Sequence, residues 1–300
     1  MYQNYMFDGG SYKLERFIEL IEDVGGYIIT KRIHAQDAKI TFAIPTEDFV
    51  YVKECAKEVQ GEIKDAPLLG TEIAVITPTL SRHHLPHLLC DIAEYLRRQG
   101  AQTNMIGLSR GAGRRVAQLS EREKRLIEEH DVAVIGLGNF KRCIEEKVKI
   151  FSELNVPLVV TGLPPVQSPD FIYIEKLGRI PYKFKRKGEI DLLEGVAKGV
   201  EKAIKKVRED ISVNPPVVPP FIVKDEILHQ VEDVSYGLAP GVLTLRTNGL
   251  RVKLPYSIYS KDVANVEIAE YKLKEISTIR ESTNRGRILV DLLPESLVEV

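Results

Sequence analysis

Four apolar runs, separated by segments with helical periodicity, constrain the fold more than any other feature of this sequence. Stretches such as Ala74-Val75-Ile76 and Val132-Ala133-Val134-Ile135 show no alternation of apolar and polar residues. Strands of this kind are buried on both faces, as in parallel sheets covered by helices on either side. The pattern therefore predicts an α/β protein with a doubly wound, Rossmann-like sheet, whose strands lie at 71–77, 103–109, 132–138 and 157–163.

The first 69 residues follow a different pattern. Apolar periodicity and glycine positions predict the order strand, helix, strand, strand, helix, strand, which is the split βαβ or ferredoxin-like arrangement. Gly25 and Gly61 each follow a predicted helix, where a glycine readily adopts a left-handed conformation. We expect both glycines to end their helices, and residues 1–69 to form an N-terminal ferredoxin-like domain.

Beyond residue 188 the sequence pattern changes twice, from a charged helix to a proline-rich linker and then to short strands. A charged helix is predicted at 189–210, and Asn214-Pro215-Pro216-Val217-Val218-Pro219-Pro220 is typical of a stiff polyproline-type linker. Asn248-Gly249 lies between two apolar runs and predicts a hairpin, and 287–293 predicts a further strand. We therefore expect a Rossmann-like core with a trailing helix at 70–213 and a small β-rich module at 221–300.

Composition argues against several classes of protein. The 42 basic and 43 acidic residues nearly cancel, so no overall field favours nucleic acid or an anionic membrane. No apolar run approaches the roughly 20 residues that a membrane helix needs, and no secretory signal is visible. The three cysteines lack C-x-x-C spacing and suit a reducing compartment. We expect a soluble, cytoplasmic protein that binds neither nucleic acid nor membrane.

The densest chemical feature is Arg82-His83-His84-Leu85-Pro86-His87-Leu88-Leu89-Cys90-Asp91, which holds three of the six histidines. It follows the first core strand, at the edge where open α/β sheets bind ligands. If a helix begins at Pro86, Cys90 lies away from its apolar stripe. A helix N-terminus and nearby imidazoles favour the thiolate that metals require. The alternative is a histidine-rich loop that caps the helix and covers a structural thiol.

Cys143 follows the third core strand, at the start of the next predicted helix. In a sheet ordered 2-1-3-4, its loop faces the Cys90 loop across the point where the strand order reverses. Two thiols from different loops could then share one ligand. Cys143 also borders the apolar stripe of its helix, so ordinary packing is the alternative.

A glycine-rich turn follows the second core strand and contains Arg110, Gly111, Gly113 and Arg114. Its backbone amides and guanidinium groups could hold an anion. The third glycine of a dinucleotide fingerprint is replaced by Val116, and no phosphate-binding G-x-x-x-x-G-K-[ST] run occurs. A basic turn that contacts protein is the alternative. Since no catalytic motif is recognised, we assign no catalytic residue.

The stretches HHLPHLLCDIAEYLRR, NMIGLSRGAGRR and LIEEHDVAVIGLGNFKRCIEEK resemble the methanogenesis marker protein 7 family, and the likeness covers essentially the whole chain. The core is also similar to the paralogous methyl-coenzyme M reductase operon protein C. That relative has histidine at the position of Cys143 and no counterpart of His87. The residues that match it are Arg82, His84, Cys90, Ile92, Gly138, Asn139 and Lys147.

This resemblance implies a subunit of the ATP-dependent complex that activates methyl-coenzyme M reductase. Its partners would be the reductase, operon protein C, other methanogenesis marker proteins and an ATP-binding activation component. It also implies a complex iron-sulfur cluster, similar to the precursor cluster of nitrogenase, held by Cys90, Cys143 and His84 and completed by another subunit. Arg82, Arg110 and Arg114 would stabilise its negative charge. The alternatives are a nucleotide- or metabolite-binding α/β enzyme and a cofactor-free scaffold.

Overall fold

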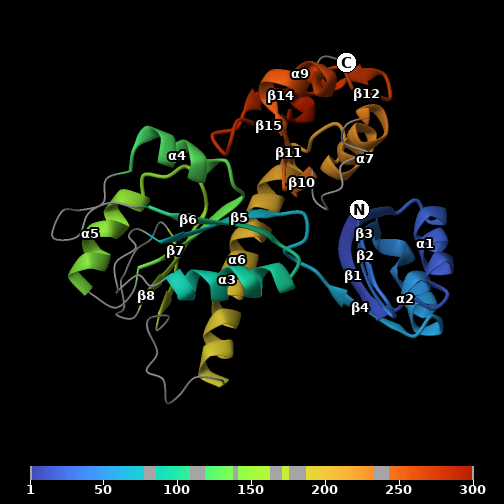
Figure 1. Cartoon of the computed structure of the whole chain (residues 1–300), viewed down its shortest axis with the longest axis horizontal. Helices are drawn as coiled ribbons and strands as arrows, with labels where there is room; N and C mark the ends of the chain where they lie inside the picture. The colour runs from blue at the N-terminus through green and yellow to red at the C-terminus, as the bar shows by residue number, and fades with distance from the viewer. Residues whose placement is uncertain are drawn as a thin grey trace. The chain divides into compact units, whose positions relative to one another are not determined.

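The computed structural model describes residues 2–77, 86–108, 119–137, 141–162, 171–175, 187–232 and 243–298 (Figure 1). The chain divides into two compact units, Met1–Leu69 and Gly70–Val300. The fold is mixed α/β with one parallel sheet and separate antiparallel sheets, which confirms the predicted class. In the described part of the chain, no helix is long and apolar enough to cross a membrane.

The first unit has the ferredoxin-like order of elements. Its sheet is ordered β2-β3-β1-β4, and every neighbouring pair of strands is antiparallel. Both helices pack on one face of this sheet, around a core that includes Phe7, Phe17 and Phe42. The elements are β1 Tyr2–Gly10, α1 Leu14–Asp23, β2 Tyr27–His34, β3 Asp37–Pro45, the short 3-10 turn Thr46–Asp48, α2 Phe49–Glu58 and β4 Gly61–Asp65.

The two glycines expected to end these helices behave differently. Gly25 adopts φ +70°, as predicted, but after α2 it is Gln60 that adopts the left-handed conformation, with φ 61°. Gly61 instead pairs with Gly9 of β1, beneath the ring of Phe7. A Cβ atom on Gly61 would lie 2.0 Å from a ring carbon of Phe7. Gly61 therefore makes room for an aromatic ring and does not end the helix.

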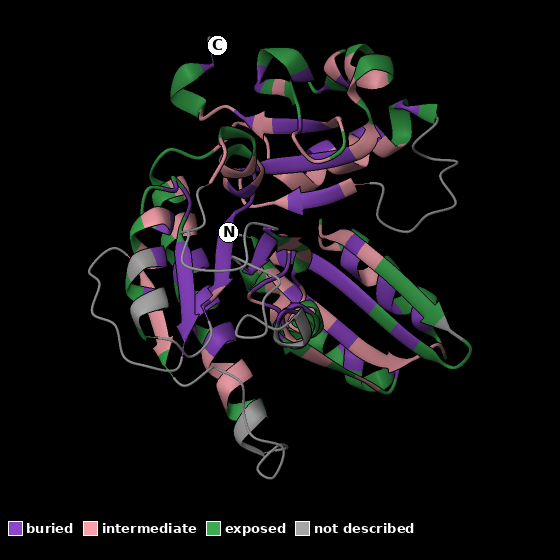
Figure 2. Cartoon of the chain, turned by 60° about the vertical axis from the view of Figure 1, so that its left-hand side comes forward, coloured by how far each residue is buried: buried purple, intermediate pink, exposed green. Residues whose placement is uncertain are grey.

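The second unit is built on a five-stranded parallel sheet. Its strands are β5 Glu72–Thr77, β6 Gln102–Gly107, β7 Val132–Gly136, β8 Leu158–Gly162 and β9 Ile172–Glu175. The sheet order is β6-β5-β7-β8-β9, so the predicted 2-1-3-4 order of the first four strands is confirmed. The central strands β5, β7 and β8 are buried over nearly their whole length (Figure 2). The edge strand β9 was not predicted, although Phe171-Ile172-Tyr173-Ile174 is a short apolar run; its residues Ile172 to Ile174 are only half-buried.

Helices cover both faces of the parallel sheet. Helices α3 Pro86–Arg98 and α6 Lys187–Val213 contact each other and the strands on one face. Helices α4 Glu121–Glu128 and α5 Lys141–Phe151 pack on the other, through Ile127 and Ile144. Ser120-Glu121-Arg122-Glu123 has the sequence pattern of a capping box, and such a box opens α4. The Ser120 hydroxyl accepts the Glu123 N–H, and the Glu123 carboxylate accepts the Ser120 N–H at 2.8 Å.

The C-terminal part of this unit contains more helix than expected. Helix α7 Pro220–Gln230 begins on the last proline of the predicted linker, because proline is well suited to the first turn of a helix. The predicted hairpin at Asn248-Gly249 joins two strands of an antiparallel sheet ordered β10-β11-β15-β14. The remaining elements are β10 Leu243–Arg246, β11 Gly249–Pro255, α9 Tyr256–Ala264, β12 Glu267–Ile268, β13 Tyr271–Lys272, the 3-10 turn Leu273–Glu275, β14 Ser277–Glu281, β15 Arg287–Leu292 and the 3-10 turn Glu295–Leu297.

The four-stranded C-terminal sheet has two chemically different faces. Leu250, Val252, Ile288 and Val290 point into an apolar core shared with α7 and α9. Because successive side chains of a strand alternate, the intervening residues form a polar face on the opposite side. We use this term for Arg246, Arg251, Lys253, Arg280, Ser282, Arg287 and Asp291. Arg251 is fully buried there, where it contacts residues of the parallel sheet.

Candidate functional site

The candidate ligand edge lies where the strand order of the parallel sheet reverses. Strands β5 and β7 are adjacent and in register, with Ile76 opposite Ile135. The chain leaves β5 toward β6 on one side and leaves β7 toward β8 on the other. Such a switch point separates the connections that follow the two strands and leaves a crevice beyond their carboxyl ends. Helix α3 follows β5 and helix α5 follows β7, so both predicted cysteine positions belong to connections that start at this edge.

Cys90 occupies the second turn of α3, and its side chain is exposed to solvent. Its neighbours Leu89, Ile92, Ala93 and Leu96 are buried against the sheet. The prediction that Cys90 lies away from the apolar stripe is therefore confirmed. Cys55 is different: it is buried in the core of the first unit, and burial raises the pKa of its thiol, as expected for a packing residue.

Most of the other predicted site residues lie outside the described residues. These are Arg82, His84, Arg110, Gly111, Gly113 and Arg114. Cys143 is the third residue of α5, but its side chain is not described. Over the ranges given above, no group of three or more histidine, cysteine or acidic side chains could hold a metal ion. The proposed ligand set thus stays a prediction apart from the exposure of Cys90.

Thr161 adds a polar group to this edge that sequence reasoning did not single out. It lies near the carboxyl end of β8, is fully buried, and its hydroxyl has no hydrogen-bond partner among the described residues. The neighbouring strand β7 has Gly136 there, and a Cβ atom on this glycine would lie 3.9 Å from the Thr161 hydroxyl oxygen. A threonine that ends an apolar strand, as in Leu158-Val159-Val160-Thr161, was the available signal. A buried hydroxyl without a partner costs about 1–3 kcal/mol, so it is well suited to bind a ligand or water.

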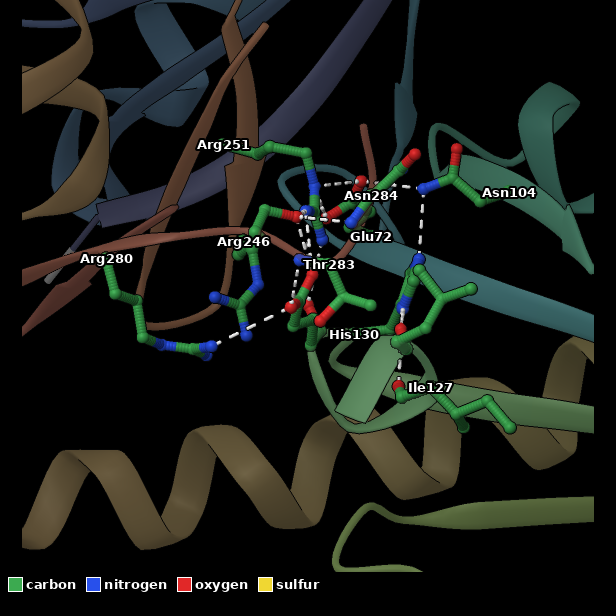
Figure 3. A network of polar contacts seen from close by, with 12 residues as sticks. Glu72, Asn104, Ile127, His130, Arg246, Arg251, Arg280, Thr283 and Asn284 are labelled. Atoms are coloured by element: carbon green, nitrogen blue, oxygen red, sulfur yellow. Dashed lines mark hydrogen bonds and ion pairs between the residues drawn. The ribbon is translucent and has the colours of Figure 1, made fainter. Parts of the chain in front are cut away.

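The opposite, amino-terminal edge of the sheet contains a network of buried charges (Figure 3). The Arg251 guanidinium donates from Nε to both carboxylate oxygens of Glu72, at 2.9 and 3.0 Å. Its Nη1 donates to Glu129 at 3.1 Å and also contacts the hydroxyl of Ser282. Glu129 further accepts hydrogen bonds from Ser282 Oγ at 2.6 Å and from Thr283 N at 2.7 Å. Burial opposes ionisation of Glu129, but these hydrogen bonds hold its pKa below the ordinary value.

A second set of contacts joins the same two sheets through Asp131. Its carboxylate accepts the Glu72 N–H at 2.7 Å and both the N–H and the hydroxyl of Thr247, at 3.1 and 2.6 Å. Burial raises the pKa of Asp131, while the nearby Arg246 opposes this rise. Arg246 and Arg280 share the carboxylate of Asp291, at 2.6 and 3.0 Å.

His130 completes the network as a neutral side chain. Asn104 Nδ2 donates to Glu72 at 2.7 Å and lies 3.0 Å from His130 Nε2. Nε2 is therefore the acceptor, and Nδ1 carries the proton and donates to the Leu126 carbonyl at 3.0 Å. Burial lowers the pKa of His130. One signal for the whole network was overlooked: an arginine stands within the apolar stretch Leu250-Arg251-Val252.

Fold and site together define a doubly wound α/β protein with an exposed thiol near its ligand edge and a C-terminal sheet bound to the other edge by buried ion pairs. The chain belongs to the methyl-coenzyme M reductase operon protein C family, which its residues 2–266 match. The predicted kinship with operon protein C is thus confirmed.

Three relatives show how far the similarity extends. An uncharacterised protein of Methanocaldococcus jannaschii is 45% identical over 299 residues, which are 100% of this chain and 96% of that protein. Methyl-coenzyme M reductase operon protein C of Methanococcus vannielii is 28% identical over 157 residues, 48% of this chain and 79% of its own length. The protein of that name from Methanosarcina barkeri is 32% identical over 108 residues, 33% of this chain and 52% of its own.

Proposed function

We propose that this chain is a non-catalytic subunit of the ATP-dependent complex that activates or assembles methyl-coenzyme M reductase. In this role it helps to bind a complex iron-sulfur cluster for low-potential electron delivery to the nickel cofactor of the reductase. The observation that supports this most directly is the solvent-exposed thiol of Cys90 on the helix that follows β5. Membership of the operon protein C family links the chain to the reductase.

The available donors suit such a cluster chemically. Cysteine thiolates are the usual ligands of iron-sulfur clusters, and histidine can replace some of them. In this proposal Cys90 and Cys143 are ligands, and His84 is either a ligand or a hydrogen-bond donor to one. The unpartnered hydroxyl of Thr161 is a further donor at the same sheet edge. When bound, the cluster supplies one-electron transfer at low potential. So few ligands from one chain require another subunit to complete the set.

The surrounding residues would tune this site. Arg82, Arg110 and Arg114 stabilise an anionic cluster, since nearby cations and hydrogen bonds adjust the potential and the affinity of such centres. The partners of the complex are operon protein C, other methanogenesis marker proteins and the ATP-binding activation component. Affinity purification from native extract should recover them. Recovery of a lone chain, with the reductase activated normally in its absence, would contradict the proposal.

The ligand assignment is tested by purifying the tagged complex under strict exclusion of oxygen. Iron and sulfide content and the EPR spectrum are compared for the native chain, Cys90→Ala and Cys55→Ala. We expect Cys90→Ala to lose iron and reductase activation while subunit assembly is preserved. Cys55→Ala is the matched control, because it removes a buried thiol in the other unit. If the Cys90→Ala complex keeps its full iron content and activates the reductase fully, Cys90 is not a ligand. That result would favour the alternative that the chain is a cofactor-free scaffold.

A further inference from the structure

Six cationic side chains belong to the C-terminal sheet and its β14–β15 turn, and they fall into two groups. Arg246, Arg251 and Arg280 each form ion pairs with carboxylates. The other three are Lys253, Arg285 and Arg287. Across the described residues, these three side chains have neither an ion pair nor a hydrogen bond.

The backbone brings the three unpaired cations to one end of the polar face. The pairing of β11 with β15 is interrupted between Val252 and Pro255, so Lys253 lies in a bulge, and Pro255 is opposite Arg287. Backbone hydrogen bonds hold the turn that contains Arg285 next to this bulge. The Tyr256 N–H donates to the Gly286 carbonyl at 2.8 Å, and the Ser282 N–H donates to the Arg287 carbonyl at 2.7 Å.

These charges lie close enough to repel one another. Burial and then the charge of Arg287 lower the pKa of Lys253. Burial, Arg285 and Arg251 lower the pKa of Arg287 in the same way. The charge of Arg287 therefore opposes that of Lys253, the charge of Arg285 opposes that of Arg287, and an anion bound among them would reduce this repulsion.

Nearby carboxylates compensate the charge of this group only in part. Glu72 favours the charged forms of Lys253 and Arg287, but its two oxygens already accept from Arg251. Glu281 lies beside Gly286 and forms no ion pair with the described residues. The other cations of the polar face form ion pairs with Glu72, Glu129 and Asp291, whereas Lys253, Arg285 and Arg287 form none with the described residues.

We infer that Lys253, Arg285 and Arg287 form a binding site for a multiply charged phosphate-type oxyanion, either free or as the phosphate chain of a nucleotide. Two guanidinium groups present planar pairs of N–H donors that match phosphate oxygens, and the ammonium group adds a compact positive charge. Three cations, one from the bulge, one from the turn and one from the first residue of β15, suit a small ligand of high charge density. The site lies near the amino ends of the parallel strands, so it is independent of the proposed cluster site.

The test is calorimetric titration of the full chain with pyrophosphate at low ionic strength. Lys253→Gln/Arg287→Gln should weaken binding by about tenfold or more, because it removes two of the three charge-assisted contacts to the anion. Lys202→Gln/Lys206→Gln removes the same charge from an exposed stretch of α6 and should leave binding unchanged. A thermal melt of each variant reports whether the fold is kept, and Arg285→Gln is a single-site substitute if the double variant fails to fold.

Titration with ATP and AMP distinguishes the two sources of phosphate. Tighter binding of ATP than of pyrophosphate indicates a nucleotide, and equal binding of the two indicates a site for the phosphate chain alone. The inference is overturned if the native chain does not bind pyrophosphate, or if the variant at positions 253 and 287 binds it as well as the native chain does. Tighter binding of polyglutamate than of pyrophosphate would also overturn it and would indicate an acidic protein surface.

Discussion

The Nε atom of Arg251 lies 2.9 and 3.0 Å from the two carboxylate oxygens of Glu72, although these residues are 179 positions apart in the sequence. Glu72 begins the first strand of the parallel sheet, and Arg251 lies in the middle of the C-terminal sheet. Both side chains are almost completely buried. A single guanidinium group therefore joins the beginning of the second unit to its end.

Replacing Arg251 by methionine should strongly destabilise the protein. The change leaves Glu72 and Glu129 buried without their cation, and loss of one partner from a buried ion pair costs about 3–5 kcal/mol. Urea denaturation should show this loss in the free energy of unfolding. Lys198→Gln, which breaks an exposed ion pair with Glu194 in α6, is the control and should cause no measurable loss. A similar, small effect of both variants would show that the Arg251 network contributes little to stability.

Glu72→Gln should partly rescue the Arg251→Met variant. Without the arginine, Glu72 is an unpaired buried charge, and a neutral amide can still accept the hydrogen bond from Asn104. The double variant is expected to lose less stability than the sum of the two single variants, by about 0.5–3 kcal/mol. A double-mutant cycle in urea measures this coupling, and strict additivity of the two changes would contradict direct pairing.

Stability should fall as the pH drops below about 6.5, the ordinary pKa of histidine. The folded state keeps His130 neutral because burial lowers its pKa, whereas the unfolded chain takes up the proton. Its contribution is therefore fully present above the unfolded pKa and is lost as the pH falls toward the lower folded pKa, by at most about 1.4 kcal/mol per pH unit. His130→Gln should reduce this slope in urea denaturation between roughly pH 7 and pH 5. An unchanged slope would assign the loss to other groups.

The two described thiols should differ in reactivity. Cys90 is exposed and Cys55 is buried, so a maleimide reagent should modify Cys90 first, and Cys55 should react at a comparable rate only in denaturant. Peptide mapping by mass spectrometry measures both sites in the same sample. Protection of Cys90 in the iron-loaded complex, compared with the isolated chain, is expected if it is a cluster ligand. Equal reaction rates of Cys90 and Cys55 in the native chain would contradict the described burial.

Thr161→Val should separate stability from ligand binding. Valine has nearly the same shape as threonine and removes a buried hydroxyl without a partner, so the isolated chain should be as stable as before or more stable, by up to about 3 kcal/mol. Iron retention in the activation complex should fall if the hydroxyl contacts the bound group. Thr41→Val is the matched control, because the Thr41 hydroxyl is hydrogen-bonded to Thr30 at 2.6 Å and its loss should be destabilising. Destabilisation by Thr161→Val would indicate that its hydroxyl already has a partner.

The sequence predicted the local parts of this fold well and its long-range contacts poorly. Apolar runs located four of the five parallel strands, and Ser120 with Glu123 located the start of α4. Helix α9 was not predicted: it has nine residues, and Val263 is buried while Tyr256 and Tyr259 are only partly buried against the same core. The exposure of Cys90 followed from helical periodicity alone.

The Arg251 network could not be predicted in the same way. Its partners are 122 and 179 residues away, and no local pattern specifies which buried carboxylates an arginine will meet. The histidine-rich loop is a dense local pattern and was predicted as a site, whereas the opposite edge of the sheet was not. The unpaired cations at Lys253, Arg285 and Arg287 became recognisable only when the partners of the neighbouring arginines were known.

The Arg251 network also has a consequence for protein synthesis. Glu72 and Glu129 leave the ribosome long before Arg251, so a nascent chain that has completed all five parallel strands still lacks the cation that neutralises them. Until the C-terminal sheet is translated, the carboxylates of Glu72 and Glu129 have no arginine partner and must stay hydrated, although the finished protein buries them. The second unit therefore completes its folding near the end of translation or after release, and during that interval its amino-terminal edge is available to chaperones.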